Sequence, residues 1–141
     1  MADIKKLVQD KDKAVNGVWV HINIPGWEGA EIKLASQRTR EFQFYVAKGR
    51  KPKSAGEFSK VEDFDPAEIY EISMENMASK IILDWKGITN GDEEFPCSYE
   101  NAVKLLDACP EFYDFVVVES RKMDHFRPDV LAAAEESLGK S

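Results

Sequence analysis

Apolar and polar residues alternate along residues 17–36 in the pattern of a β-hairpin. Every second position is apolar in two short runs, at 18–24 and at 32–34. A period of two places the apolar side chains of a strand on one side of a sheet. The Pro-Gly-Trp-Glu-Gly sequence between the runs has the residues that turns favour, with Trp27 at its tip. We therefore predict two antiparallel strands joined by this turn.

The segments on either side of the hairpin have weaker patterns. Residues 1–16 are mostly polar, and we predict a flexible arm or a short helix there. Residues 38–47 fit both a helix and a strand, and we favour the helix because Thr39 can cap its start. The next segment, 48–60, contains five Lys or Arg residues, two glycines and one proline. We predict that it is a basic loop, which is either a linker or a contact surface.

The chain from residue 65 to 138 has the spacing typical of helices. Asp65 can cap the first of them, and Pro66 suits its first turn. Apolar residues then recur three and four positions apart as far as Ile88. We therefore predict one long helix of about twenty residues that ends at Gly87.

Three further helices are predicted after this one. We expect Ser98 to cap the first, Pro110 to open the second, and an alanine-rich helix to cover residues 128–138. These elements predict an α+β fold, in which an N-terminal β-hairpin is followed by a mostly antiparallel helical C-terminal part. A chain of 141 residues has the length of one domain, so we expect residues 17–141 to form a single domain.

The composition excludes several classes of protein. Hydrophobic residues at 43% and aromatic residues at 11% are too many for an intrinsically disordered chain. No apolar run approaches the roughly 18 residues of a membrane span, and the first ten residues lack the apolar segment of a signal peptide. We therefore expect a soluble cytosolic protein that does not contact a membrane. Cys97 and Cys109 flank a predicted helix about 18 Å long, so we expect both to stay reduced.

The two halves of the chain carry opposite charge. Residues 1–60 hold 12 Lys/Arg and 7 Asp/Glu, a balance of +5, whereas residues 61–141 hold 7 and 19, a balance of −12. The net charge of −7 argues against nucleic-acid binding, because that affinity depends on positive charge. The asymmetry favours head-to-tail self-association or a basic partner. The alternative is a solvated acidic helical surface beside a basic loop.

The sequence contains no recognisable catalytic, metal or cofactor site. Cys97, Cys109, His21 and His125 are the candidates for nucleophile and base, and none stands in a known catalytic context. There is no Cys-x-x-Cys or His-x-x-x-His spacing for a metal ion, and no glycine-rich phosphate loop followed by a helix. We therefore predict a protein that is not an enzyme and that binds no cofactor.

A few apolar residues remain as candidates for contact with a partner. Trp27 is a bulky aromatic residue in a glycine-rich turn, a position that often anchors a partner. The alternative is that the tip folds back on the helices. Met74 and Met77 lie on the predicted long helix and can adapt to irregular apolar surfaces, although core packing is the alternative for both.

Residues 82–106 carry a resemblance to a known family. The stretch Ile-Leu-Asp-Trp-Lys-Gly-Ile at 82–88 is followed by Asn-Gly, by Phe-Pro, by Ser-Tyr-Glu-Asn-Ala at 98–102 and by a Leu-Leu pair. This order resembles the tail assembly chaperones of long-tailed bacteriophages and their prophage relatives. The similarity extends over about residues 17–126 and is most diagnostic in 82–118.

The resemblance implies a transient role without catalysis. Chaperones of this family coat the long helical tape measure protein, keep it soluble and recruit the tail tube protein that replaces them. The resemblance therefore implies action in the host cytoplasm, absence from the mature virion and a homo-oligomeric state. The family also often has a longer product made by frameshifting, which a Gly139-Lys140 codon pair would permit.

This resemblance leads to a hypothesis about contact residues. We expect Trp27 and the basic loop to contact a neighbouring subunit, and a helical groove that includes Met74, Met77 and Phe112 to hold the client. Two other classes of function stay open. One is a structural tail or neck component of a phage particle, and the other is a small hydrolase that depends on one of the two cysteines.

Overall fold

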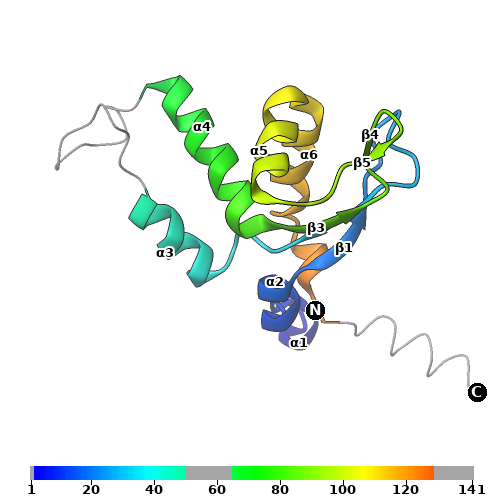
Figure 1. Ribbon diagram of the computed structural model, residues 1–141. Coiled ribbons are helices and arrows are strands. Elements are labelled where there is room, and N and C mark those ends of the chain that lie inside the picture. Colours follow the sequence, from blue (N-terminus) through cyan, green and yellow to red (C-terminus); the bar gives the residue numbers. More distant parts are fainter. Residues whose placement is uncertain (1, 50–64, 129–141) are drawn as a thin grey trace, which may run out of the picture.

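A three-stranded antiparallel sheet lies at the centre of the fold (Figure 1). The computed structural model describes residues 2–49 and 65–128 of the chain. The strands β1 (Val18–His21), β2 (Glu31–Leu34) and β3 (Ile82–Lys86) follow one another across the sheet in this order. The predicted hairpin and the α+β class are thereby confirmed. The basic loop beyond residue 49 and the predicted C-terminal helix from residue 129 onward lie outside the described residues.

Strand β3 corrects the prediction of one long helix up to Gly87. The helix α4 covers only Pro66–Asn76 and passes through one π-helical turn, η2 (Met77–Ile81), into the strand. A β-bulge interrupts the pairing of β2 with β3, so that Leu34 pairs with Ile82 while its neighbour in β2 pairs with Asp84. The extra residue brings the buried Ile82 and Trp85, three positions apart, to the same side of the sheet. This spacing imitates that of a helix, which explains the wrong prediction.

The other predicted helix starts are confirmed by their capping hydrogen bonds. The Asp65 carboxylate accepts the N–H of Ala67 at the start of α4. The Ser98 hydroxyl accepts the N–H of Asn101 at the start of α5 (Tyr99–Ala108). Pro110 opens α6 (Pro110–Glu119), which is shorter than predicted because a 3-10 turn, η3 (Met123–Phe126), follows it. Local side-chain chemistry therefore determines where these helices begin.

Helix α3 (Arg40–Gly49) confirms that residues 38–47 form a helix rather than a strand. The Thr39 hydroxyl accepts the N–H of Phe42, as expected of a cap. Phe42 is the one buried residue among residues 40–48. Figure 1 shows α3 beside α4 and apart from the sheet, so this helix has little of its surface in the core.

The N-terminal segment forms two short helices, α1 (Ile4–Leu7) and α2 (Lys11–Asn16). The sequence left a flexible arm and a short helix as alternatives for this segment, and the structure shows that it is helical. Ala14 of α2 is fully buried, and its carbonyl accepts the N–H of Ser36 at 2.8 Å. The N–H of Asp10 in turn donates to the carbonyl of Phe126 at 2.7 Å. These bonds join α2 to both the end of β2 and the turn after α6.

The core lies between the sheet, the helices α5 and α6, and the end of α4 with its π-helical turn η2. Its fully buried members include Ile32 and Leu34 of β2, Leu106 of α5, and Phe112 and Val116 of α6. A second small hairpin, β4 (Thr89–Asn90) and β5 (Glu93–Glu94), follows β3 where the sequence predicted only a turn. The core thus joins the sheet to α4, α5 and α6, and α3 contributes the buried Phe42.

Candidate protein-binding surfaces

Of the four residues that the sequence suggested for partner binding, three belong to the core and the fourth, Trp27, packs against it. Met74 and Met77 are 5% and 3% exposed, and Phe112 is fully buried. The ring of Trp27 stacks on that of Phe112, with 5.2 Å between the centroids and 3° between the planes. For the methionines the structure shows the alternative of core packing, and the hairpin tip folds back on the helices. These side chains therefore offer a partner little exposed surface of their own, although Met74 and Met77 each line a surface groove.

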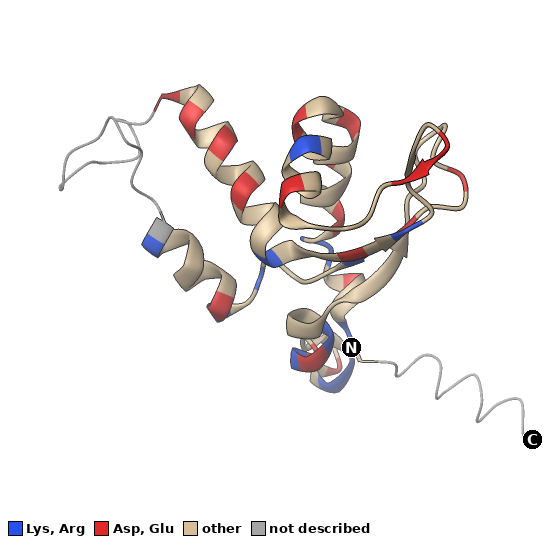
Figure 2. Ribbon diagram, in the orientation of Figure 1, with Lys and Arg blue, Asp and Glu red and all other residues tan. Residues whose placement is uncertain are grey.

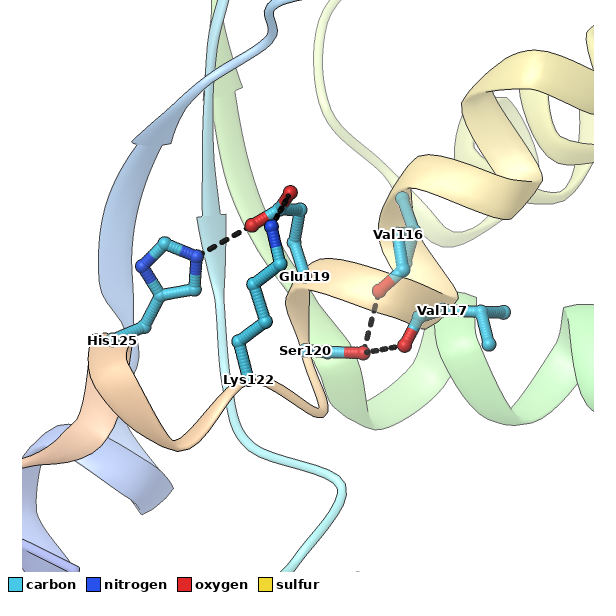
Figure 3. Close-up of polar contacts among 6 residues, drawn as sticks. All are labelled: Val116, Val117, Glu119, Ser120, Lys122 and His125. Atoms are coloured by element: carbon cyan, nitrogen blue, oxygen red, sulfur yellow. Dashed lines mark hydrogen bonds and ion pairs between the residues drawn. The ribbon is translucent and has the colours of Figure 1, made fainter.

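A cluster of polar side chains at the end of α6 contains residue types found in catalytic sites. Glu119 accepts hydrogen bonds from His125 Nε2 at 2.6 Å and from Lys122 Nζ at 2.7 Å (Figure 3). The hydroxyl of the adjacent Ser120 points the other way, toward the carbonyl oxygens of Val116 and Val117. A nucleophile has to contact its base, so Ser120, His125 and Glu119 do not form a catalytic triad.

The same cluster holds the last turn of α6 in place. Burial alone would raise the pKa of Glu119, but the hydrogen bonds from His125 and Lys122 outweigh it, so the pKa is lowered. On its other side, the Ser120 hydroxyl accepts a hydrogen bond from Gln37 Nε2 at 2.8 Å, and its carbonyl accepts the Gln37 N–H at 3.0 Å. These contacts connect α6 to the segment that leads into α3, which makes the cluster structural.

The remaining candidates for chemistry are the cysteines and His21. Both cysteines are free thiols, as expected. Burial raises the pKa of the Cys97 thiol to about 11, with a smaller contribution from the carboxylate of Asp84. A thiol with such a pKa is almost entirely protonated at neutral pH and is a poor nucleophile. His21 lies in a largely exposed position on β1 next to Glu31. Within residues 2–49 and 65–128, no three side chains of His, Cys, Asp or Glu gather as metal ligands would.

A groove of about 370 Å³ with both apolar and polar walls runs between α3 and α4. We call it the α3–α4 groove. Its apolar lining comes from both helices and from the turn that follows α4: Phe42, Val46, Ile69, Ile72 and Met77. Polar and charged residues line the groove as well: Gln37, Arg38, Gln43, Ser73, Asn76 and Arg121. Ile69 is 41% exposed, so apolar surface of this groove is open to solvent.

The sequence offered a signal for this groove that our prediction did not use. The apolar stripe assigned to the predicted long helix included Tyr70, Met74 and Met77 but not Ile69 and Ile72. Residues three positions apart lie on the same side of a helix. Ile69 and Ile72 therefore form a second apolar stripe of α4. In the structure this stripe faces α3.

A second hollow, between α4 and α5, is acidic rather than apolar. We call it the α4–α5 groove, and its volume is about 660 Å³. Its lining residues are Ala67, Tyr70, Glu71, Met74 and Glu75 from α4, and Glu100, Val103, Lys104 and Asp107 from α5. Figure 2 shows acidic residues repeated along α4 and on the neighbouring helices. Desolvation raises the pKa of the Tyr70 hydroxyl, and nearby Tyr113, Asp107 and Asp114 raise it further.

The comparisons with known proteins give one match. A family model described as "YdaY prophage protein" matches residues 35–137, which is well over half of the chain. No curated protein and no solved structure matches. In the described part of the chain, no helix has the length and apolar character to cross a bilayer.

Proposed function

The chain belongs to the YdaY prophage protein family, and from this membership we propose that it is a tail assembly chaperone. In this role it binds the helical tape measure protein in the host cytoplasm, keeps it soluble and yields it to the tail tube protein. It makes and breaks no covalent bond. The similarity of residues 82–106 to tail assembly chaperones supports the proposal, as does the origin of the family in prophages.

The observation that carries the proposal is the α3–α4 groove. Two helices with apolar facing sides form a cleft that suits the apolar side of a third, amphipathic helix. Val46 and Ile72 supply its walls from opposite helices, and Ile69 opens it to solvent. A long helical client offers many such apolar stripes, and each would expose its side chains to aggregation without cover.

The size of the groove fits a transient complex. Each large apolar side chain that a client inserts contributes roughly 1.5–3 kcal/mol when fully buried. A groove of about 370 Å³ accommodates only a few side chains, and the entropic cost of association offsets much of their contribution. The resulting affinity per site is modest, so a tail tube subunit can displace the chaperone during assembly.

Co-expression with the tape measure protein tests the proposal. We expect the wild-type chain to raise the soluble fraction of the tape measure protein, and Ile69→Asp to abolish this effect by placing a charge in the groove. Val118→Asp is the matched control, because Val118 is also an exposed apolar residue of a helix, at 53%, but lies on α6. Circular dichroism serves to check that both variants are folded.

Two outcomes would contradict the proposal. One is a tape measure protein that is equally soluble without this chain. The other is the recovery of this chain in stoichiometric amounts from purified phage particles by mass spectrometry, which would indicate a structural tail or neck component instead. If Ile69→Asp and Val118→Asp act alike, the α3–α4 groove is not the client site.

A further inference from the structure

The α4–α5 groove combines an apolar floor with a negatively charged rim. Met74 lies at its floor and is 5% exposed, with Val103 half-buried beside it. The rim carries four carboxylates, those of Glu71, Glu75, Glu100 and Asp107, against the single ammonium of Lys104. All five of these charged residues are exposed. Such a groove attracts a positively charged polypeptide segment that also has apolar groups to bury.

The chain itself contains a segment of this chemistry. Residues 48–60 hold five Lys or Arg residues and one Glu, and Phe58 adds an aromatic side chain. The segment belongs to the half of the chain with a balance of +5, whereas the groove belongs to the half with −12. We propose that the α4–α5 groove binds the basic segment 48–60 of a second copy of this chain, so that copies associate head to tail.

The position of the groove favours a second copy over the chain's own segment. Ile69 and Ile72 line the α3–α4 groove, whereas Tyr70 and Glu71 line the α4–α5 groove, so the two grooves lie on different sides of α4. Helix α3, which precedes the basic segment in the sequence, lines the α3–α4 groove and contributes no residue to the α4–α5 groove. Between its lysines and the start of α4, the sequence places Glu62 and Asp63, which the acidic rim would repel.

A contact of this kind joins two different surfaces, the groove of one copy and the basic segment of the next. One unoccupied groove and one unbound segment therefore remain at the two ends of an assembly. Copies therefore add one after another into open chains unless the rotation between them closes a ring. The inference does not depend on the proposed function, because it concerns the other side of α4 and a different partner. It adds a means by which copies could line up along an extended client.

Sedimentation velocity over a range of protein concentrations tests the proposal. We expect the wild-type chain to form species larger than a dimer at low ionic strength, and added salt to reverse this association. The groove variant Glu71→Lys/Glu75→Lys and the segment variant Lys51→Glu/Lys53→Glu should each weaken association by about tenfold or more. The control Glu93→Lys/Glu94→Lys makes the same change of charge on β5 and should associate like the wild type.

Mixing the two variants gives the sharpest readout. The segment variant keeps an intact groove and the groove variant keeps an intact segment, so an equimolar mixture should associate under conditions in which neither variant associates alone. Three outcomes would overturn the proposal: a wild-type chain that stays monomeric at low salt, variants that each still self-associate, or a mixture that stays monomeric. The first of these would also result if the segment docked on its own chain or if the groove bound a different basic protein.

Discussion

The stacked pair of Trp27 and Phe112 gives a prediction that the structure makes quantitative. The Trp27 side chain is half-buried against the core, and its ring lies parallel to that of Phe112 at 5.2 Å. Burial of roughly half of a tryptophan removes about 100 Å² from water, which contributes about 2.5 kcal/mol at ~25 cal/mol/Å². The stacking adds about 0.5–1.5 kcal/mol. Some relaxation of the loop after truncation is expected, so Trp27→Ala should lower the free energy of unfolding by about 3 kcal/mol.

Urea unfolding followed by circular dichroism measures this change. A loss of about 3 kcal/mol corresponds to a midpoint roughly 1–2 M lower in urea for a domain of this size. Trp27→Phe should recover most of the loss, because a phenyl ring can still stack on Phe112. Phe44→Ala is the control, since Phe44 is 67% exposed and its truncation should change the midpoint little. If Trp27→Ala costs less than about 1 kcal/mol, the hairpin tip does not rest on the core in solution, and Trp27 is again a candidate anchor for a partner.

Two further predictions concern stability. Glu119→Gln should cost about 1–3 kcal/mol at pH 7, because a buried, charge-assisted hydrogen-bond acceptor is replaced by a neutral one. Folding lowers the pKa of Glu119 from its ordinary value of 4.5. Its contribution to stability is therefore fully present above pH 4.5 and is lost as the pH falls through the lowered pKa. The thermal unfolding midpoints of the variant and the wild type should thus converge in acid. Gly87→Ala should cost about 2 kcal/mol or more, because Gly87 has φ +74° and a Cβ there would lie 2.8 Å from the carbonyl oxygen of Gly29. Gly91→Ala, at φ +64° with open space around it, should cost only about 1 kcal/mol by urea unfolding, and equal losses at both sites would refute the proposed steric contact.

The features that the sequence predicted correctly depend on neighbours within a few positions. The caps at Asp65 and Ser98 each bond an N–H two or three residues ahead, so their effect does not depend on the rest of the fold. The hairpin of β1 and β2 likewise depends on two short runs of alternating residues and on the turn between them. Patterns of this range can be read directly from the order of the residues.

Strand β3 could not be predicted in this way, because its pattern depends on a strand about fifty positions earlier. The bulge opposite Lys33 and Leu34 changes which β3 residues face the core, and only the paired structure shows it. The stacking of Trp27 on Phe112 is of the same kind. A contact between a hairpin tip and a helix more than eighty positions later leaves no periodic signal in either segment.

The two grooves show why the candidate surfaces were harder to predict than the fold. Helix α4 has an apolar stripe that includes Ile69 and a charged stripe that includes Glu71, and residues two positions apart point to nearly opposite sides of a helix. The sequence displays both stripes, but it does not show that α3 lies along one and α5 along the other. Because α4 separates the grooves, a client in one leaves the other free for a second copy. Substitutions at Ile69 should therefore impair solubilisation of the client without preventing self-association, whereas substitutions at Glu71 and Glu75 should do the reverse.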